Sequence, residues 1–122
     1  MEDVPVGVDI IEIDRIERTL RRFGSRFLER VYTADEISYC RGRPAQLAAR
    51  FAAKEAVMKA LGTGTRGVGW RDVEITREQT GKPRINQTGR AAARAQRLGI
   101  RNIGVSISHS HTFAVASVVA NC

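Results

Sequence analysis

Apolar residues along this chain form both a β-branched run and a helical repeat, and each pattern predicts one type of element. The β-branched run 4–11, VPVGVDII, predicts a short buried strand. Ile16, Leu20 and Phe23 then recur at positions i, i+4 and i+7, which places them on one face of a helix. Gly24 follows them directly and is expected to end that helix. The pattern therefore predicts a strand that leads straight into an amphipathic helix.

The rest of the chain continues to mix helical and strand patterns. Thr33 and Glu36 match a capping box, so a short helix is expected to begin there. The alanine-rich segment 45–61 predicts the longest helix, and the glycine-rich segment 62–69 predicts a loop after it. Further strands are expected at 73–77, 84–86, 103–108 and 113–119, with a helix capped by Thr88 between the second and third of these. Hairpins without regular βαβ alternation indicate the α+β class, with an antiparallel sheet packed against helices.

Length and charge narrow the class of protein further. The chain has 122 residues, which fits a single domain spanning 1–122, and carries 20 Lys and Arg against 13 Asp and Glu. No apolar run is long enough to span a membrane and no signal-peptide pattern is present, so a cytoplasmic protein is expected. The formal net charge of +7 indicates a polyanionic partner: a nucleic acid, a phosphorylated substrate or an acidic protein. Charge alone does not choose among the three.

Charged residues inside apolar patterns are the first candidates for chemistry. Asp9 lies in the apolar run 4–11, where a carboxylate needs a partner: either a hydrogen bond at the strand end or a hard cation. Glu55 and Lys59 lie four residues apart on the longest predicted helix, a spacing that also suits a plain surface ion pair. Lys54 falls within the apolar stripe of that helix and therefore needs an anion or a position at its rim.

Two polar segments could line a ligand site. Gly62, Thr63 and Gly64 follow the longest helix, and their backbone N–H groups could approach a phosphate, although the segment lacks P-loop spacing. Ser106 and His109 belong to a polar strand end that could equally line a ligand site or be an ordinary exposed edge. A serine hydrolase is not expected, because no nucleophile elbow is present and adjacent residues of a strand point to opposite faces.

Four motifs occur in the order and spacing of a known family. They are GVDIIEIDRI at 7–16, RFAAKEAVMKALGTG at 50–64, GKP at 81–83 and VSISHS at 105–110. Over nearly its whole length the chain resembles the holo-[acyl-carrier-protein] synthases, the short bacterial-type 4′-phosphopantetheinyl transferases. The resemblance implies Mg²⁺-dependent transfer of 4′-phosphopantetheine from coenzyme A to a serine of acyl carrier protein, with release of adenosine 3′,5′-bisphosphate. It also implies an α+β homotrimer with active sites between subunits, serving fatty acid or polyketide synthesis.

The resemblance and the chemistry of phosphate together assign roles to individual residues. Asp9 and Glu55 are expected to hold Mg²⁺, and Lys59 to offset phosphate charge, so these residues form the expected catalytic set. The expected coenzyme A contacts are Lys54, Gly62, Thr63, Gly64, Lys82, Pro83, Ser106 and His109. The basic first helix is expected to dock the acidic carrier protein through Arg15, Arg18 and Arg22, with Arg21 beside them. Because the nucleophilic serine belongs to the carrier, this chain needs none of its own.

A small nucleic-acid-binding domain is the main alternative. It explains the net charge of +7 and the arginine-rich first helix, but it does not explain Asp9 within a strand. Aromatic residues, which nucleic-acid modules use for stacking, make up only 6% of the chain. An inactive family member that serves as a binding subunit would not need to retain Asp9, Glu55 and Lys59. An enzyme with a polyanionic substrate is therefore preferred, and no nucleic-acid or membrane partner is expected.

Overall fold

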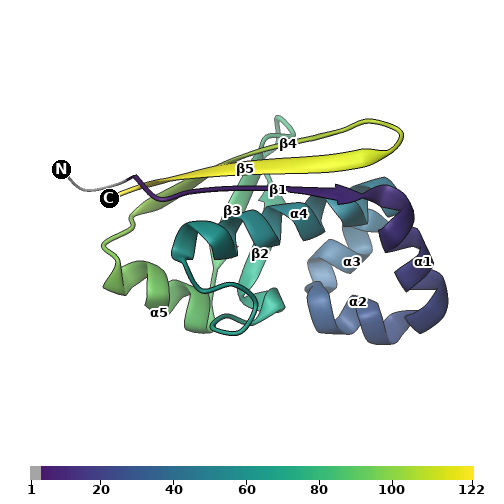
Figure 1. The fold of residues 1–122 in the computed structure, drawn as a ribbon, viewed down its shortest axis with the longest axis horizontal. Coiled ribbons are helices and arrows are strands. Elements are labelled where there is room, and N and C mark those ends of the chain that lie inside the picture. The colour runs from purple at the N-terminus through teal and green to yellow at the C-terminus, as the bar shows by residue number, and fades with distance from the viewer. Residues whose placement is uncertain (1–3) are drawn as a thin grey trace.

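The computed structural model describes residues 4–122 as two antiparallel sheets and a set of helices (Figure 1). The strands are β1 (Val6–Glu12), β2 (Val73–Arg77), β3 (Pro83–Gln87), β4 (Asn102–His109) and β5 (Phe113–Asn121). The helices are α1 (Ile13–Phe23), α2 (Ser25–Val31), α3 (Ala34–Cys40), α4 (Pro44–Leu61) and α5 (Gly89–Arg97), with a 3₁₀ turn at Trp70–Asp72. The expected strands and helices are present with bounds within a few residues of the prediction.

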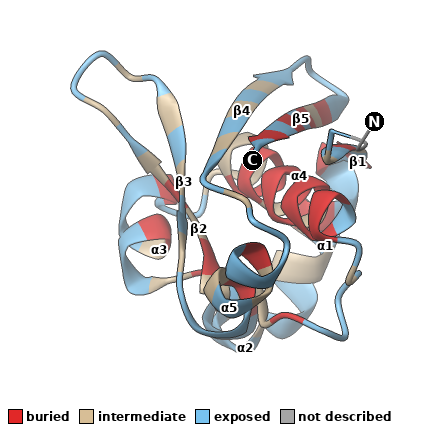
Figure 2. Cartoon of the chain, turned by 90° about the vertical axis from the view of Figure 1, so that its left-hand side faces the viewer, coloured by how far each residue is buried: buried red, intermediate tan, exposed pale blue. Residues whose placement is uncertain are grey.

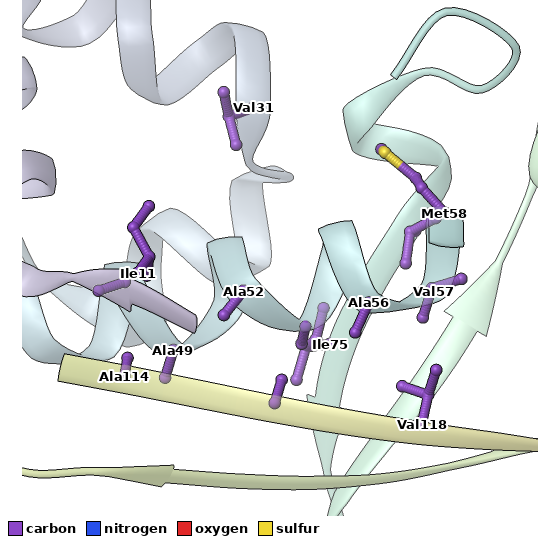
Figure 3. Close-up of a cluster of buried hydrophobic side chains, with 14 of the residues drawn as sticks. Ile11, Val31, Ala49, Ala52, Ala56, Val57, Met58, Ile75, Ala114 and Val118 are labelled. Atoms are coloured by element: carbon purple, nitrogen blue, oxygen red, sulfur yellow. The ribbon is translucent and has the colours of Figure 1, made fainter. Parts of the chain in front are cut away.

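The longest helix, α4, packs along the inner face of a three-stranded sheet whose strand order is β1-β5-β4. Ala49, Ala52 and Ala56 of α4 lie close to Ala114 and Val118 of β5 (Figure 3). Small side chains on both surfaces let the helix approach the sheet closely, and α4 is buried along most of its length (Figure 2). Helices α1, α2 and α3 gather at one end of α4 and α5 lies at the other, with the β2-β3 hairpin alongside.

Gly7 of β1 marks the closest approach of the strand to α4. A methyl group at this position would overlap the backbone carbonyl of Ala56, which cannot move without disturbing the helix. We expect Gly7→Ala to lower the free energy of unfolding by about 3 kcal/mol or more in urea denaturation, because overpacking strains both backbones. Gly104→Ala on β4 is the matched control, since its methyl group would meet its nearest neighbour at 3.8 Å. Equal stability of the two variants would contradict this account of β1.

Helix ends follow the predicted signals with one exception. The Thr33 hydroxyl accepts a hydrogen bond from the backbone N–H of Glu36, and the Glu36 carboxylate accepts one from the N–H of Thr33, so the capping box before α3 is confirmed. α4 ends at Gly62, where the glycine-rich segment was expected to begin, and Gly62 adopts the left-handed conformation. Thr88 precedes α5, but its side chain makes no capping hydrogen bond, so the expected Thr88 cap is wrong.

The outer face of the three-stranded sheet is apolar and exposed. Val8 and Ile10 of β1 are 59% and 62% exposed, and Val6 lies beside them. Phe113 and Val119 of β5 continue the same face, because register pairs Val6 with Val119. This surface is called the outer apolar face below. None of the helices within residues 4–122 is long and apolar enough to cross a membrane.

Candidate functional site

The structure brings Asp9, Glu55 and Lys59 together where β1 crosses α4. The Lys59 ammonium lies 3.1 Å from Asp9 Oδ1 and donates a second hydrogen bond of 2.9 Å to the carbonyl oxygen of Val8. The Asp9 side chain is 12% exposed, whereas that of Lys59 is 54% exposed. The strand position of Asp9 turns its side chain toward the helix, and one helical turn separates Glu55 from Lys59. We call these residues the carboxylate site.

The electrostatics of the carboxylate site suit a divalent cation. Burial raises the pKa of the Glu55 carboxyl above its ordinary value, and the nearby carboxylate of Asp9 raises it further. The positive charges of Lys59 and Arg15 oppose this rise. Two adjacent carboxylates offer the hard oxygen donors that Mg²⁺ prefers, and Mg²⁺ is commonly held by one or two carboxylates together with substrate phosphates. The donor set of Asp9 and Glu55 therefore fits Mg²⁺, although residues 4–122 contain no cluster of three or more metal-binding side chains.

A second feature is a cavity of about 440 Å³ between the start of α4, the tip of the β2-β3 hairpin and the end of β4. Its polar and charged lining includes Gln46, Arg50, Arg77, Ser108 and His109. Arg50 is only 2% exposed, and its Nε has no hydrogen-bond partner among the described residues. A buried guanidinium with a free donor at a cavity wall favours an anionic ligand. We call this feature the arginine cavity.

The carboxylate site and the arginine cavity lie on opposite flanks of α4 within one chain. Arg50 and Lys59 are nine residues apart, which corresponds to a rotation of about 180° around the helix axis. The two features are also separated across the sheet. Asp9 of β1 pairs with Ala116 of β5, and Ala116 pairs on its other side with Ile107 of β4, which lines the cavity. The central strand β5 thus separates β1 from β4. Within one chain the carboxylate site and the arginine cavity therefore face in different directions.

Lys54 has a structural role, contrary to the expected coenzyme A contact. Its side chain is 0% exposed and its ammonium forms an ion pair of 2.8 Å with Glu36. The same ammonium donates hydrogen bonds to the carbonyl oxygens of Trp70, at 3.1 Å, and of Val73. Burial lowers the pKa of Lys54, and the Glu36 carboxylate opposes that change. All three donors of the ammonium are used inside the protein, so the prediction that Lys54 contacts a ligand is wrong.

Some backbone N–H groups of the glycine-rich segment after α4 already form hydrogen bonds that cap the helix. The N–H groups of Gly62 and Thr63 donate to the carbonyl oxygens of Lys59 and Met58 at the end of the helix. Two of the N–H groups expected to bind phosphate are therefore already used within the chain, which contradicts that part of the prediction. Gly64, with a φ of 59°, remains the candidate of this segment for a backbone contact with phosphate.

The other expected coenzyme A contacts do not all lie in one cavity. Pro83 and His109 line the arginine cavity. Ser106 is exposed on the outer side of β4 and does not line it, whereas Ser108 does. Lys82 and Pro83 line a neighbouring cavity of about 380 Å³ between β3 and β4. The structure thus places His109 and Pro83 together and leaves Ser106 and Lys82 outside the arginine cavity.

The expected docking residues share one exposed surface of α1. Arg15, Arg18 and Arg22 line a shallow hollow of about 310 Å³ together with Phe23. Arg18 also pairs with Asp14 at 3.1 Å, an exposed contact that water screens. Arg15 lies close enough to Glu55 to affect the pKa of its carboxyl. The basic surface is therefore continuous with the carboxylate site.

Sequence reasoning missed the residues that define the arginine cavity. Arg50 falls between the buried Leu47 and the core-packed Phe51, and a charge at such spacing is a signal that the sequence does contain. Arg77 and Ser108 carry no comparable signal, because each is an ordinary polar residue at a strand end. Arg77 and Ser108 line the arginine cavity only because β2 and β4 pack close to α4.

Known proteins resemble this chain in both sequence and fold. Residues 5–116 match the family model of the 4′-phosphopantetheinyl transferase superfamily. A holo-[acyl-carrier-protein] synthase of Moorella thermoacetica is 56% identical over 113 residues, covering 90% of this chain and 88% of that protein. The homologous enzyme of Koribacter versatilis is 51% identical, covering 93% and 94%.

Solved structures agree with these relatives. The holo-[acyl-carrier-protein] synthase of Helicobacter pylori, in complex with coenzyme A, superposes with a TM-score of 0.87 at 34% identity, covering 95% of this chain and 99% of that one. The Bacillus anthracis enzyme, in complex with coenzyme A (3′,5′-ADP), gives a TM-score of 0.78 at 36% identity, with 96% of each chain covered. The shared α+β fold with antiparallel sheets is the predicted class.

This chain belongs to the 4′-phosphopantetheinyl transferase superfamily. Within the superfamily it is a member of the holo-[acyl-carrier-protein] synthases, because its close relatives cover nearly all of its length. The predicted family and enzyme class are therefore confirmed. The assignment also decides against a nucleic-acid-binding domain.

Proposed function

We propose that this chain transfers 4′-phosphopantetheine from coenzyme A to a serine of an acidic apo-acyl carrier protein. In this reaction the serine Oγ forms a bond to the phosphorus next to pantetheine, and the pyrophosphate P–O bond breaks to release adenosine 3′,5′-bisphosphate. The observation that carries the proposal is the pairing of Asp9 and Glu55 beside Lys59, in a chain of this family. Such a site provides positioning and charge compensation, which phosphoryl transfer chiefly requires.

Asp9 and Glu55 are the residues that would hold Mg²⁺. When bound, the ion would neutralise charge on the pyrophosphate of the substrate. The Lys59 ammonium keeps Asp9 oriented through their 3.1 Å contact and presents a positive charge at the same place. Because its side chain is half exposed, Lys59 is accessible to a phosphate oxygen as well.

The arginine cavity is the proposed site for the nucleotide end of coenzyme A. Its cationic wall, with Arg50 and Arg77, suits a phosphate, and His109 and Pro83 provide a surface for the ribose and base. The Helicobacter and Bacillus enzymes were solved in complex with coenzyme A, which supports coenzyme A as the ligand but does not locate its site. Arg50 and Arg77 replace Lys54 in the set of residues expected to bind phosphate.

We infer that the complete site forms between copies of the chain in a homotrimer. Coenzyme A must contact both the carboxylate site and the arginine cavity, yet α4 separates these half-sites within one chain. The outer apolar face, with Val8 and Ile10 about 60% exposed, needs a covering surface. A cyclic trimer would cover that face and join the carboxylate site of one chain to the cavity of the next.

Intact-mass analysis of an apo-acyl carrier protein tests the proposed reaction directly. The carrier is incubated with this protein, coenzyme A and Mg²⁺, and the expected result is a mass gain equal to one 4′-phosphopantetheine group. Removal of the divalent ion with EDTA should abolish the gain, and added Mg²⁺ should restore it. A carrier whose mass stays unchanged under all conditions would refute the proposed function.

Arg15 is expected to matter for the carrier and not for coenzyme A. Arg15→Glu places a negative charge where an acidic helix would dock, so the KM for the carrier should rise about tenfold or more while the KM for coenzyme A changes less than about twofold. Steady-state kinetics at two salt concentrations measures both effects. Arg97→Glu is the control, because it makes the same charge change on an exposed part of α5 at the far end of α4. Equal weakening of both substrates by Arg15→Glu would exclude α1 as the docking surface.

A further inference from the structure

The guanidinium groups of three arginines surround the ring of Tyr39, a residue of α3. The guanidinium carbon of Arg50 lies 4.1 Å from the ring centroid, that of Arg77 lies at 5.2 Å and that of Arg43 at 5.4 Å. These distances are within the range of cation–π attraction. Arg43 precedes α4, Arg50 belongs to α4 and Arg77 ends β2, so one aromatic ring brings a distant strand residue together with two arginines near the start of α4.

None of these arginines is neutralised within the described part of the chain. The ion pairs found between residues 4 and 122 involve other cations. Arg43 instead donates to the carbonyl oxygens of Tyr39 and Cys40, and Arg77 donates to that of Gly81. Arg50 is buried with its Nε unpartnered. Three cations therefore converge on one ring without an ion pair of their own among the described residues, and a bound anion would relieve their mutual repulsion.

We propose that Tyr39 is a positioning residue that holds Arg50 and Arg77 ready for a phosphate of coenzyme A in the arginine cavity. Arg50 and Arg77 line that cavity, and both guanidinium groups lie over the ring of Tyr39, which does not line it. A tyrosine suits this task because its ring attracts guanidinium groups without neutralising them, whereas a carboxylate would compete with the phosphate. The inference rests on the proposed function, because coenzyme A supplies the phosphate.

Tyr39→Leu removes the ring and Tyr39→Phe keeps it, so the two variants form a matched pair. Tyr39 is 40% exposed, so leucine at this position should leave the fold intact. The probe is adenosine 3′,5′-bisphosphate, whose affinity is measured by isothermal titration calorimetry at fixed low salt. We expect Tyr39→Leu to weaken binding about tenfold and Tyr39→Phe to change it less than about twofold.

Steady-state kinetics separates a positioning role from a merely structural one. In the Tyr39→Leu variant the KM for coenzyme A should rise about tenfold, while kcat and the KM for the carrier stay within about twofold of the wild type. A variant that loses kcat and both KM values together, or in which phenylalanine is as harmful as leucine, would overturn the inference.

The calorimetry also distinguishes this inference from the proposed function. Wild-type protein that fails to bind adenosine 3′,5′-bisphosphate would refute the coenzyme A site itself, and the role of Tyr39 with it. Wild-type binding that Tyr39→Leu leaves unchanged would refute the role of Tyr39 alone.

Discussion

Replacing Asp9 with asparagine is expected to reduce kcat for carrier modification at least about a hundredfold while the protein remains folded. The substitution removes one of the two carboxylates that would hold Mg²⁺, and it removes the negative charge from the 3.1 Å ion pair with Lys59. Stability should change by less than about 1 kcal/mol, because Lys59 is half exposed and water can solvate its freed charge. Steady-state turnover over a range of Mg²⁺ concentrations, together with thermal unfolding, measures both effects.

Glu29→Gln is the matched control for Asp9→Asn. It also removes one carboxylate, but Glu29 is exposed on α2, outside the three-stranded sheet. Turnover of the Glu29→Gln enzyme should match the wild type within about twofold, since its charge is screened from the site. Wild-type turnover in the Asp9→Asn enzyme would remove the metal-binding role of Asp9.

The second large effect is on stability and concerns Lys54. Lys54→Met should lower the free energy of unfolding by about 3–5 kcal/mol, because it leaves the buried Glu36 carboxylate without its cation. Lys59→Met is the control on the same helix. It removes a lysine that is 54% exposed, so its cost in stability should stay below about 1 kcal/mol although turnover falls. Urea denaturation compares the two variants.

A double variant and one kinetic measurement test the structural role of Lys54 further. Adding Glu36→Gln to Lys54→Met should recover part of the lost stability, since no unpaired charge then remains buried. At a temperature where the Lys54→Met protein is folded, its KM for coenzyme A should equal that of the wild type. An increased KM with unchanged stability would show instead that Lys54 contacts the substrate.

Local signals predicted the fold well because each acts within a few residues. The capping box at Thr33 and Glu36 and the end of α4 at Gly62 depend only on residues close in sequence, and both form as expected. The sequence also places Lys54 correctly within an apolar stripe. It could not reveal that the partner is Glu36, because this ion pair requires α3 to pack against α4. Periodicity indicates burial and does not identify what a buried charge meets.

The candidate site was predictable only where a motif carries it. Asp9 was singled out by its charge within an apolar run, its joint metal role with Glu55 came from the family resemblance, and the two lie together in the structure. Arg50, Arg77 and Tyr39 come from separate segments, and only the packing of α3, α4 and β2 brings them together. The sequence pointed to Ser106, whereas Ser108 lines the cavity, because this depends on where β4 ends relative to the cavity. Local sequence patterns therefore do not predict the site residues that depend on contacts between distant segments.

Mixed trimers test the central claim that a complete site joins the carboxylate site of one chain to the arginine cavity of another. Asp9→Asn and Arg50→Gln chains carry different affinity tags, are co-expressed, and are purified through both tags in turn. Each variant alone should be nearly inactive. A cyclic trimer that contains both variants has one interface with an intact Asp9 facing an intact Arg50, so about one third of wild-type activity should return. Mixed trimers that stay inactive, or chains that fail to associate, would contradict the account.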